Sequence, residues 1–199
     1  MIVYPEAWET IGRKIHLNEI VYRLMLVLRD IPCNCLSLSG GIDSSLLLYF
    51  MLQIHPEVKV FTIGSSEDHP DVKYATIIVD KISSVFSGMV THKIYIPWPD
   101  KIKRNHPNES AGDMAVRMFY KFVGQRTDGI IAGDGIDEFM CGYYLHQKSP
   151  NEKTYYNFIR KLTRDHLIPL DKNSGGIKVY LPFLDDKLIS LFSQIPISE

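Results

Sequence analysis

The sequence predicts a three-layer α/β/α protein with a mostly parallel sheet. Short apolar segments, each suited to a strand, alternate along the chain with segments whose apolar residues have helical spacing. Glycine-rich turns directly follow two of these apolar segments. Such alternation is typical of parallel βαβ units with helices on both faces of the sheet. The 199 residues are enough to bury a core of ordinary size, and we expect one domain over residues 1–199.

The predicted elements follow one another in a regular order. Apolar residues at helical spacing predict a helix over residues 17–28, which Asp30-Ile31-Pro32 ends. The expected strands cover residues 33–38, 58–63, 92–96 and 129–132, and the further expected helices cover residues 42–52, 71–84 and 114–123. Residues 101–112 contain Asn, Pro and Gly without apolar periodicity, which predicts a mobile surface loop. In such sheets ligands bind beyond the carboxyl ends of the strands, so the two glycine-rich turns are the expected sites.

Balanced charge and short apolar segments exclude several classes of function. The 22 basic and 23 acidic residues nearly cancel, so neither a nucleic-acid polymer nor a membrane surface is an expected partner. No apolar run approaches the roughly 20 residues of a membrane helix, and residues 1–14 contain no signal-peptide core. The three cysteines have neither disulfide nor zinc spacing, and the seven histidines lack paired metal spacing. We therefore expect a cytoplasmic protein in a reducing compartment.

The first glycine-rich turn, Ser39-Gly40-Gly41-Ile42-Asp43-Ser44-Ser45, lies between a predicted strand and a predicted helix. Glycines let the backbone approach an anion, N–H groups at a helix start carry partial positive charge, and hydroxyls donate to phosphate oxygens. Asp43 would repel a bare phosphate, so its presence favours a Mg²⁺ ion that bridges it to the anion. The alternative is a turn in which Asp43 and Ser44 only cap the helix. Because the Walker A lysine is missing, we predict a phosphate site of another kind.

This turn resembles the SGGxDS loop of the PP-loop pyrophosphatases, the superfamily that includes asparagine, GMP and NAD synthetases and several tRNA-modifying enzymes. The resemblance implies an adenine nucleotide alpha hydrolase-like fold. It also implies that the loop grips the pyrophosphate released when ATP is attacked at its α-phosphate. The nucleotide-binding residues implied in this loop are Ser39, Gly40, Gly41, Asp43, Ser44 and Ser45.

The second glycine-rich turn carries three carboxylates within five residues, Asp134, Asp137 and Glu138. Carboxylates this close repel one another, and proteins usually accept that cost for a cation or for acid–base chemistry. The alternative is a solvated acidic helix start, which suits the helix dipole.

Residues 132–143 resemble the SGEGSDE-x-x-x-GY signature of asparagine synthetases and the related β-lactam synthetases. The residues that match the signature are Gly133, Gly135, Asp137, Glu138, Gly142 and Tyr143. Ala132 and Ile136 each replace a serine, and Asp134 replaces a glutamate. The Asp134 side chain is one methylene shorter than the glutamate, so a contact made there is lost or the substrate is changed.

The resemblance also implies which residues form the site. It gives Asp43 and Asp137 as Mg²⁺ ligands and catalytic roles to Asp134, Asp137 and Glu138, with Asp134 near the substrate. The residues that line the ATP pocket, partly through their backbone, are Leu38, Ile63, Ala132 and Gly133. Residues 171–173 and 179–185 resemble a third family segment, D-x-x-x…VRVPFLD, in which Tyr180 stands in place of the arginine.

The resemblance, which extends from about residue 17 to residue 196, implies an ATP-dependent, AMP-forming carbon–nitrogen ligase. It would adenylate a carboxylate, first of all that of aspartate to give asparagine, and use ammonia or another amine. Family members with a glutaminase domain carry a cysteine after the initiator methionine, where this chain has Ile2, so a separate glutaminase could also supply nitrogen. The family's C-terminal lysine has no counterpart, so either Lys148, Lys153 or Arg164 substitutes for it, a partner or second subunit supplies the charge, or catalysis is weak. The alternatives are another PP-loop adenylating enzyme and a non-catalytic, ATP-binding regulatory remnant.

Overall fold

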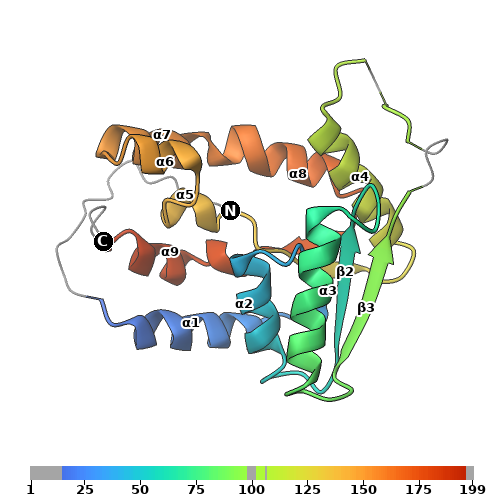
Figure 1. Ribbon diagram of the computed structural model, residues 1–199. Helices are drawn as coiled ribbons and strands as arrows, with labels where there is room; N and C mark the ends of the chain where they lie inside the picture. Colours follow the sequence, from blue (N-terminus) through green and yellow to red (C-terminus); the bar gives the residue numbers. More distant parts are fainter. Residues whose placement is uncertain (1–14, 98–101, 106, 196–199) are drawn as a thin grey trace. The chain divides into compact units, whose positions relative to one another are not determined.

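The computed structural model describes residues 15–97, 102–105 and 107–195, which form two compact units (Figure 1). The sheet unit contains the described residues within Ile31–Ala132 and Pro169–Tyr180. The helical unit contains the described residues up to Asp30, Gly133–Ile168, and those from Leu181 onward. The expectation of one domain over residues 1–199 stays a prediction.

The sheet unit contains five parallel strands in the order β3-β2-β1-β4-β5. The strands are β1 (Cys35–Ser37), β2 (Val58–Ile63), β3 (Val90–Tyr95), β4 (Gly129–Ile131) and β5 (Lys178–Tyr180). Leu36 of β1 lies in register with Val60 of β2 and Ile131 of β4, and all three side chains are fully buried. The chain runs outward from β1 to β3 and returns with β4 on the other side of β1. The strand order therefore reverses between β1 and β4, where sheets of this kind bind ligands.

Helices cover both faces of this sheet (Figure 1). The helices of the sheet unit are α2 (Ile42–Met51), α3 (Pro70–Ser83), α4 (Ala111–Val123) and most of α8 (Ile168–Asn173). Phe122 of α4 contacts Phe61 and stacks on Tyr95, with ring centroids 6.2 and 4.6 Å apart. Ile94, the neighbour of Tyr95 in β3, lines a hollow together with Val72 of α3, which packs on the other face of the sheet. The predicted three-layer α/β/α fold is confirmed.

The observed elements begin and end within a few residues of the predicted ones. Helix α4 begins at Ala111 because the Ser110 hydroxyl accepts a hydrogen bond from the Asp113 N–H at 2.9 Å and caps the helix. The expected loop over residues 101–112 is therefore shorter, and its residues 101 and 106 lie outside the described residues. Strand β5 has no counterpart among the predicted strands.

In the helical unit, apolar packing and an ion pair join α1 to the residues around α9. Its elements are α1 (Leu17–Asp30), α5 (Ile136–Phe139), α6 (Tyr144–Lys148), α7 (Glu152–Lys161), a π-helix η2 (Leu162–Leu167), a 3₁₀ turn η3 (Pro182–Leu184) and α9 (Asp186–Phe192). Helix α1 packs against α9, where Leu24, Leu28 and Leu188 are buried. Arg23 of α1 donates two hydrogen bonds to Asp185, at 2.7 and 2.6 Å. Among the described residues, no helix has both the length and the apolar character needed to cross a membrane.

Candidate active site

The first glycine-rich turn begins at a firmly held residue. Leu38 directly follows β1 and is buried, with its N–H donating to the Phe61 carbonyl at 2.9 Å. The Leu38 carbonyl accepts a hydrogen bond of 2.6 Å from the hydroxyl of Thr62 on β2. Because both strands fix Leu38, the loop that follows leaves the sheet at a defined position beside the strand-order reversal.

Two serines hold the loop in shape. The Ser44 hydroxyl lies 3.2 Å from the Ser39 hydroxyl, accepts from the Ser39 N–H and donates to the Gly41 carbonyl, both at 3.3 Å. Gly40 has a φ of +76°, and α3 packs so closely that a Cβ atom at Gly40 would overlap the backbone of Tyr74 and Ala75. The loop therefore requires glycine at position 40, because the backbone has a positive φ there and because α3 leaves no room for a side chain.

The start of α2 has no N-cap side-chain hydrogen bond among the described residues, because the N-cap residue is Gly41, in an extended conformation. The alternative in which Asp43 and Ser44 only cap α2 is therefore not supported. The Ser45 hydroxyl is buried and has no hydrogen-bond partner among the described residues. Uncapped N–H groups and an unpaired hydroxyl suit an anion such as a phosphate.

The second glycine-rich turn belongs to the helical unit, except for Ala132, which directly follows β4. The Ala132 N–H donates to the Tyr180 carbonyl of β5 at 2.9 Å. Gly135, with a φ of +93°, leads into α5, and a Cβ atom there would lie 2.5 Å from the side chain of Leu184. A Cβ atom at Gly142 would overlap the carboxylate of Asp137. The family's glycines at these positions are thus explained by close packing.

Glu138 points into the helical unit and is not a solvated residue. Its side chain is 3% exposed and accepts a hydrogen bond of 2.8 Å from the Tyr143 hydroxyl. The second carboxylate oxygen of Glu138 is buried without a hydrogen-bond partner among the described residues. Tyr143 stacks on Phe158 at 4.8 Å, and burial, together with the bond to Glu138, raises the pKa of its hydroxyl. The alternative of a solvated acidic helix start therefore does not hold for Glu138.

Asp134 pairs with His166, which is not among the site residues predicted from the sequence. Its Oδ1 atom lies 2.7 Å from Nε2 of His166, and about a third of each side chain is exposed. His166 lies in η2, and π-helical turns of this kind recur at functional sites. The hydrogen bond to Asp134 raises the pKa of His166, although its partial burial opposes the shift. No sequence signal indicates this pair, because the residues lie 32 positions apart and His166 has no metal-ligand spacing.

This pair gives a testable pH dependence of stability. Because the folded-state pKa of His166 is raised, its stabilising contribution is full below the unfolded-state pKa of about 6.5 and is lost as pH rises through the raised folded-state value. We expect the difference in urea midpoint between the wild-type protein and His166→Gln to shrink from pH 5.5 to pH 8.5. The exposed His16, changed to Gln, is the control. A difference that grows with pH would contradict the assignment.

The structure thus groups the predicted site residues by unit. Leu38, the loop of residues 39–45, Ile63 and Ala132 lie at the carboxyl edge of three neighbouring strands in the sheet unit. Gly133, Asp134, Asp137 and Glu138 belong to the helical unit. Nothing in the structure tests their roles in binding or catalysis, which stay predictions.

Metal ligands and the substitute for the family's lysine also stay predictions. Among the described residues, no group of three or more His, Cys, Asp or Glu side chains is placed to hold a metal ion. Arg164 is paired with Asp165 at 2.5 and 3.0 Å, and Lys148 lies 5.0 Å from the ring centre of Tyr144. Lys153 is exposed.

The parallel sheet, with its serine- and glycine-rich loop between β1 and α2, has the architecture of a PP-loop protein. The chain belongs to the asparagine synthase family, because the family model of asparagine synthase matches residues 17–174, more than half of its length. The family predicted from the two motifs is confirmed.

Sequence relatives agree with this family. The chain is 22% identical to a putative glutamine-hydrolyzing asparagine synthetase 1 of Methanocaldococcus jannaschii, in a match that covers 98% of this chain and 37% of the relative. It is 24% identical to the glutamine-hydrolyzing asparagine synthetase of Gallus gallus, over 90% of this chain and 34% of the relative. A 25% identical match to the Bacillus subtilis asparagine synthetase 1 covers 63% of this chain. The chain therefore spans about a third of the length of the first two relatives.

Proposed function

We propose that the chain is an ATP-dependent amide-forming ligase. A carboxylate oxygen of the substrate attacks the α-phosphorus of ATP. The bond between the α-phosphorus and the oxygen that bridges it to the β-phosphate then breaks, and pyrophosphate leaves. An amine then attacks the acyl carbon of the adenylate, and AMP leaves. The relatives are named asparagine synthetases, so aspartate and ammonia are the first substrate pair to test. The observation that carries the proposal is the uncapped, serine-rich start of α2 at the strand-order reversal.

In this reaction the first loop would bind the pyrophosphate group. The N–H groups at the start of α2 and the hydroxyls of Ser39 and Ser45 are the donors available there, whereas the Ser44 hydroxyl donates to the Gly41 carbonyl and holds the loop in shape. Donors held in place before the reaction stabilise the negative charge that develops on the leaving group. Leu38, Ile63, Ala132 and Gly133 would border the rest of the nucleotide. No side chain needs to form a covalent bond with the substrate, since alignment and electrostatics supply the rate enhancement.

A magnesium ion is part of this proposal. Mg²⁺ is usually bound in nucleotide sites by one or two carboxylates together with substrate phosphates, not by a cage of protein ligands. Asp43, in the first turn of α2, and Asp137, in α5, would supply those carboxylates. The ion, when bound, would neutralise charge on the β- and γ-phosphates. Asp134, oriented by His166, would face the acyl or amine substrate.

The decisive experiment is exchange of labelled pyrophosphate into ATP across a panel of carboxylic and amino acids. Exchange that depends on aspartate would support the proposed activity, and exchange with a different acid would indicate another adenylating enzyme. ATP binding without exchange with any acid would indicate a regulatory remnant. Product formation is then followed with ammonium, other amines, or a glutaminase added in trans.

A further prediction concerns magnesium. ATP should raise the melting temperature of the protein only when Mg²⁺ is present, because Asp43 and Asp137 would otherwise repel the triphosphate. Ligand linkage gives about 2.7 kcal/mol of stabilisation at a hundred times the Kd. AMP is the control, since it lacks the β- and γ-phosphates and its effect should not depend on Mg²⁺. Equal shifts by ATP with and without a chelator would argue against a bridging role for these carboxylates.

A further inference from the structure

Strand β3 is an edge of the sheet with an unpaired backbone. In the described part of the chain it pairs only with β2. The carbonyls of Met89 and Tyr95 accept hydrogen bonds from the β2 side, at 2.8 and 3.1 Å. Because backbone groups alternate along a strand, the N–H and C=O groups of His92 and Ile94 point away from β2. They form a row of donors and acceptors that another strand can use.

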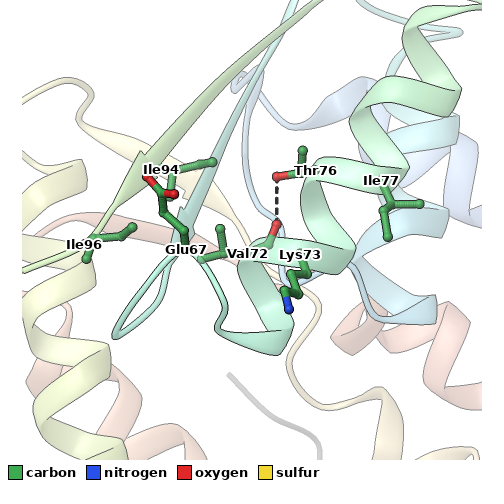
Figure 2. Close-up of a pocket in the computed structure, with 7 residues that line it drawn as sticks. All are labelled: Glu67, Val72, Lys73, Thr76, Ile77, Ile94 and Ile96. Carbon is green, nitrogen blue, oxygen red and sulfur yellow. Dashed lines mark hydrogen bonds between the residues drawn. The ribbon is translucent and has the colours of Figure 1, made fainter.

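On the α3 side of this edge lies an apolar hollow (Figure 2). Its volume is about 720 Å³, and it is lined by Glu67, Val72, Lys73, Thr76, Ile77, Ile94 and Ile96. Ile77 of α3 and Ile94 of β3 are 46% and 41% exposed, which is high for branched aliphatic side chains. Lys73 is paired with Asp68 at 2.9 Å, so its charge is already matched. Apart from Glu67 and the Lys73–Asp68 pair, this side of the edge is lined by apolar residues and Thr76, and it therefore suits aliphatic side chains.

On the α4 side lies a second hollow of about 840 Å³, which shares Ile94 and Ile96 with the first and whose charged lining residues are all basic. The cationic residues that line it are Lys103, Arg117, Lys121 and Arg126, and none of its described lining residues is acidic. Arg117 is already paired with Glu109, whereas Lys103 and Lys121 have no carboxylate partner among the described residues. Lys93, exposed on β3, points to this same face because it is two residues from Tyr95. This side of the edge suits acidic side chains.

We propose that the β3 edge binds an extended segment of a partner protein, which adds to the sheet as a sixth strand. Its alternate side chains would be aliphatic toward α3 and Ile94, and Asp or Glu toward Lys103 and Lys121. A strand alternates its side chains between faces, so one segment can fill both hollows at once. Backbone hydrogen bonds to His92 and Ile94 would supply affinity, and the two hollows would supply specificity. This surface does not depend on the proposed ligase activity.

Charge favours such a partner over a second copy of this chain. Two copies of β3 paired edge to edge would place Lys93 and the basic hollow of each copy on one continuous sheet. Like charges at that distance repel, and a lysine on an edge strand is a common barrier to self-pairing. The negative charges of an acidic strand would instead be attracted to Lys93 and the basic hollow.

The test uses synthetic peptides and the whole chain. A labelled peptide of about eight alternating valine and glutamate residues is titrated with protein and followed by fluorescence anisotropy. A peptide of the same composition, with all valines first and all glutamates last, is the control. We expect saturable binding of the alternating peptide, weaker at high salt, and at least about tenfold weaker binding of the control.

Two further peptides test the backbone bonds. One is N-methylated at every valine and the other at every glutamate, so each has lost the donors on one edge only. If the peptide pairs with β3, one of the two should bind like the parent and the other at least about tenfold more weakly. Equal affinity of the two methylated peptides would refute strand addition.

Matched protein variants test the basic hollow. Lys121→Glu should weaken peptide binding at least about tenfold, because it removes one cation and adds a repelling charge. Lys81→Glu is the control, since Lys81 lies in the last turn of α3 as Lys121 does in α4, but lines neither hollow. Both variants should keep the wild-type melting temperature.

Three further outcomes would overturn the proposal. The first is no binding of the alternating peptide at about 1 mM protein. The second is equal binding of the block-ordered control, which would mean a site for anions and not for a strand. The third is a dimer of the chain, seen by sedimentation and dissociated by the peptide, which would assign the edge to a second copy.

Discussion

Replacing Asp43 with Asn is expected to abolish adenylation while leaving the fold intact. The amide has nearly the same size but no charge, and it is a poor ligand for a Mg²⁺ ion bound to phosphates. Loss of one preorganised electrostatic contact with a developing charge commonly lowers the rate by about 10²–10³-fold. Asp43 is half-exposed in the first turn of α2, so its replacement disturbs little of the core. The measurement is pyrophosphate exchange into ATP with the best substrate from the panel.

Asp186→Asn is the matched control for this prediction. Asp186 is also an acid in the first turn of a helix, α9, so both variants lose the same interaction with a helix dipole. That interaction is worth about 0.3–1 kcal/mol, and both proteins should therefore show similar small changes in urea midpoint. Only the Asp43 variant should lose exchange. A wild-type rate of exchange in Asp43→Asn would show that Asp43 is not a metal ligand. An equal loss of exchange in both variants would indicate a general effect on stability.

The strands and helices around the first loop could be predicted because their signals are local. The segment from β1 to β2 shows its strand and helix patterns within contiguous residues, and its glycines mark the turn directly. Local signals also give the family, since both motifs are contiguous. The short strand β5 could not be predicted, because three residues between turns become a strand only when β4 lies beside them.

Contacts between residues that lie far apart in the chain could not be predicted from the sequence. The pairing of Asp134 with His166 depends on the π-helix η2, which no residue pattern in this chain indicates. The role of Ser44 also differs from simple helix capping, because its hydroxyl bonds to Ser39 and Gly41 within the loop. The sequence motif predicts that these residues lie together in one loop. Only the hydrogen bonds show which of them hold the loop in shape and which are left without a partner among the described residues.

The largest stability effect is expected from Gly40→Ala. A residue with a side chain at a φ of +76° costs about 1–2 kcal/mol, since its Cβ crowds the next carbonyl oxygen. At Gly40 the added Cβ would also lie 2.6 Å from the Cβ of Tyr74 and overlap the backbone of α3. Backbone cannot move aside as a flexible side chain can, and overpacking of this kind adds about 1–3 kcal/mol. We therefore expect a total loss of about 3 kcal/mol in the free energy of unfolding.

Gly88→Ala separates these two contributions. Gly88 has almost the same φ, +74°, but nothing lies within 4 Å of the position that a Cβ atom would take. Its replacement should therefore cost only the backbone part, about 1–2 kcal/mol. Urea unfolding of the two variants and the wild-type protein measures both losses, and the excess at Gly40 reports the contact between the loop and α3. Gly40→Ala should also weaken ATP binding, because the loop must move away from α3 to admit the methyl group. Equal losses of stability at the two glycines would show that α3 does not press on the loop, and the shape proposed for the phosphate site would then lack its support.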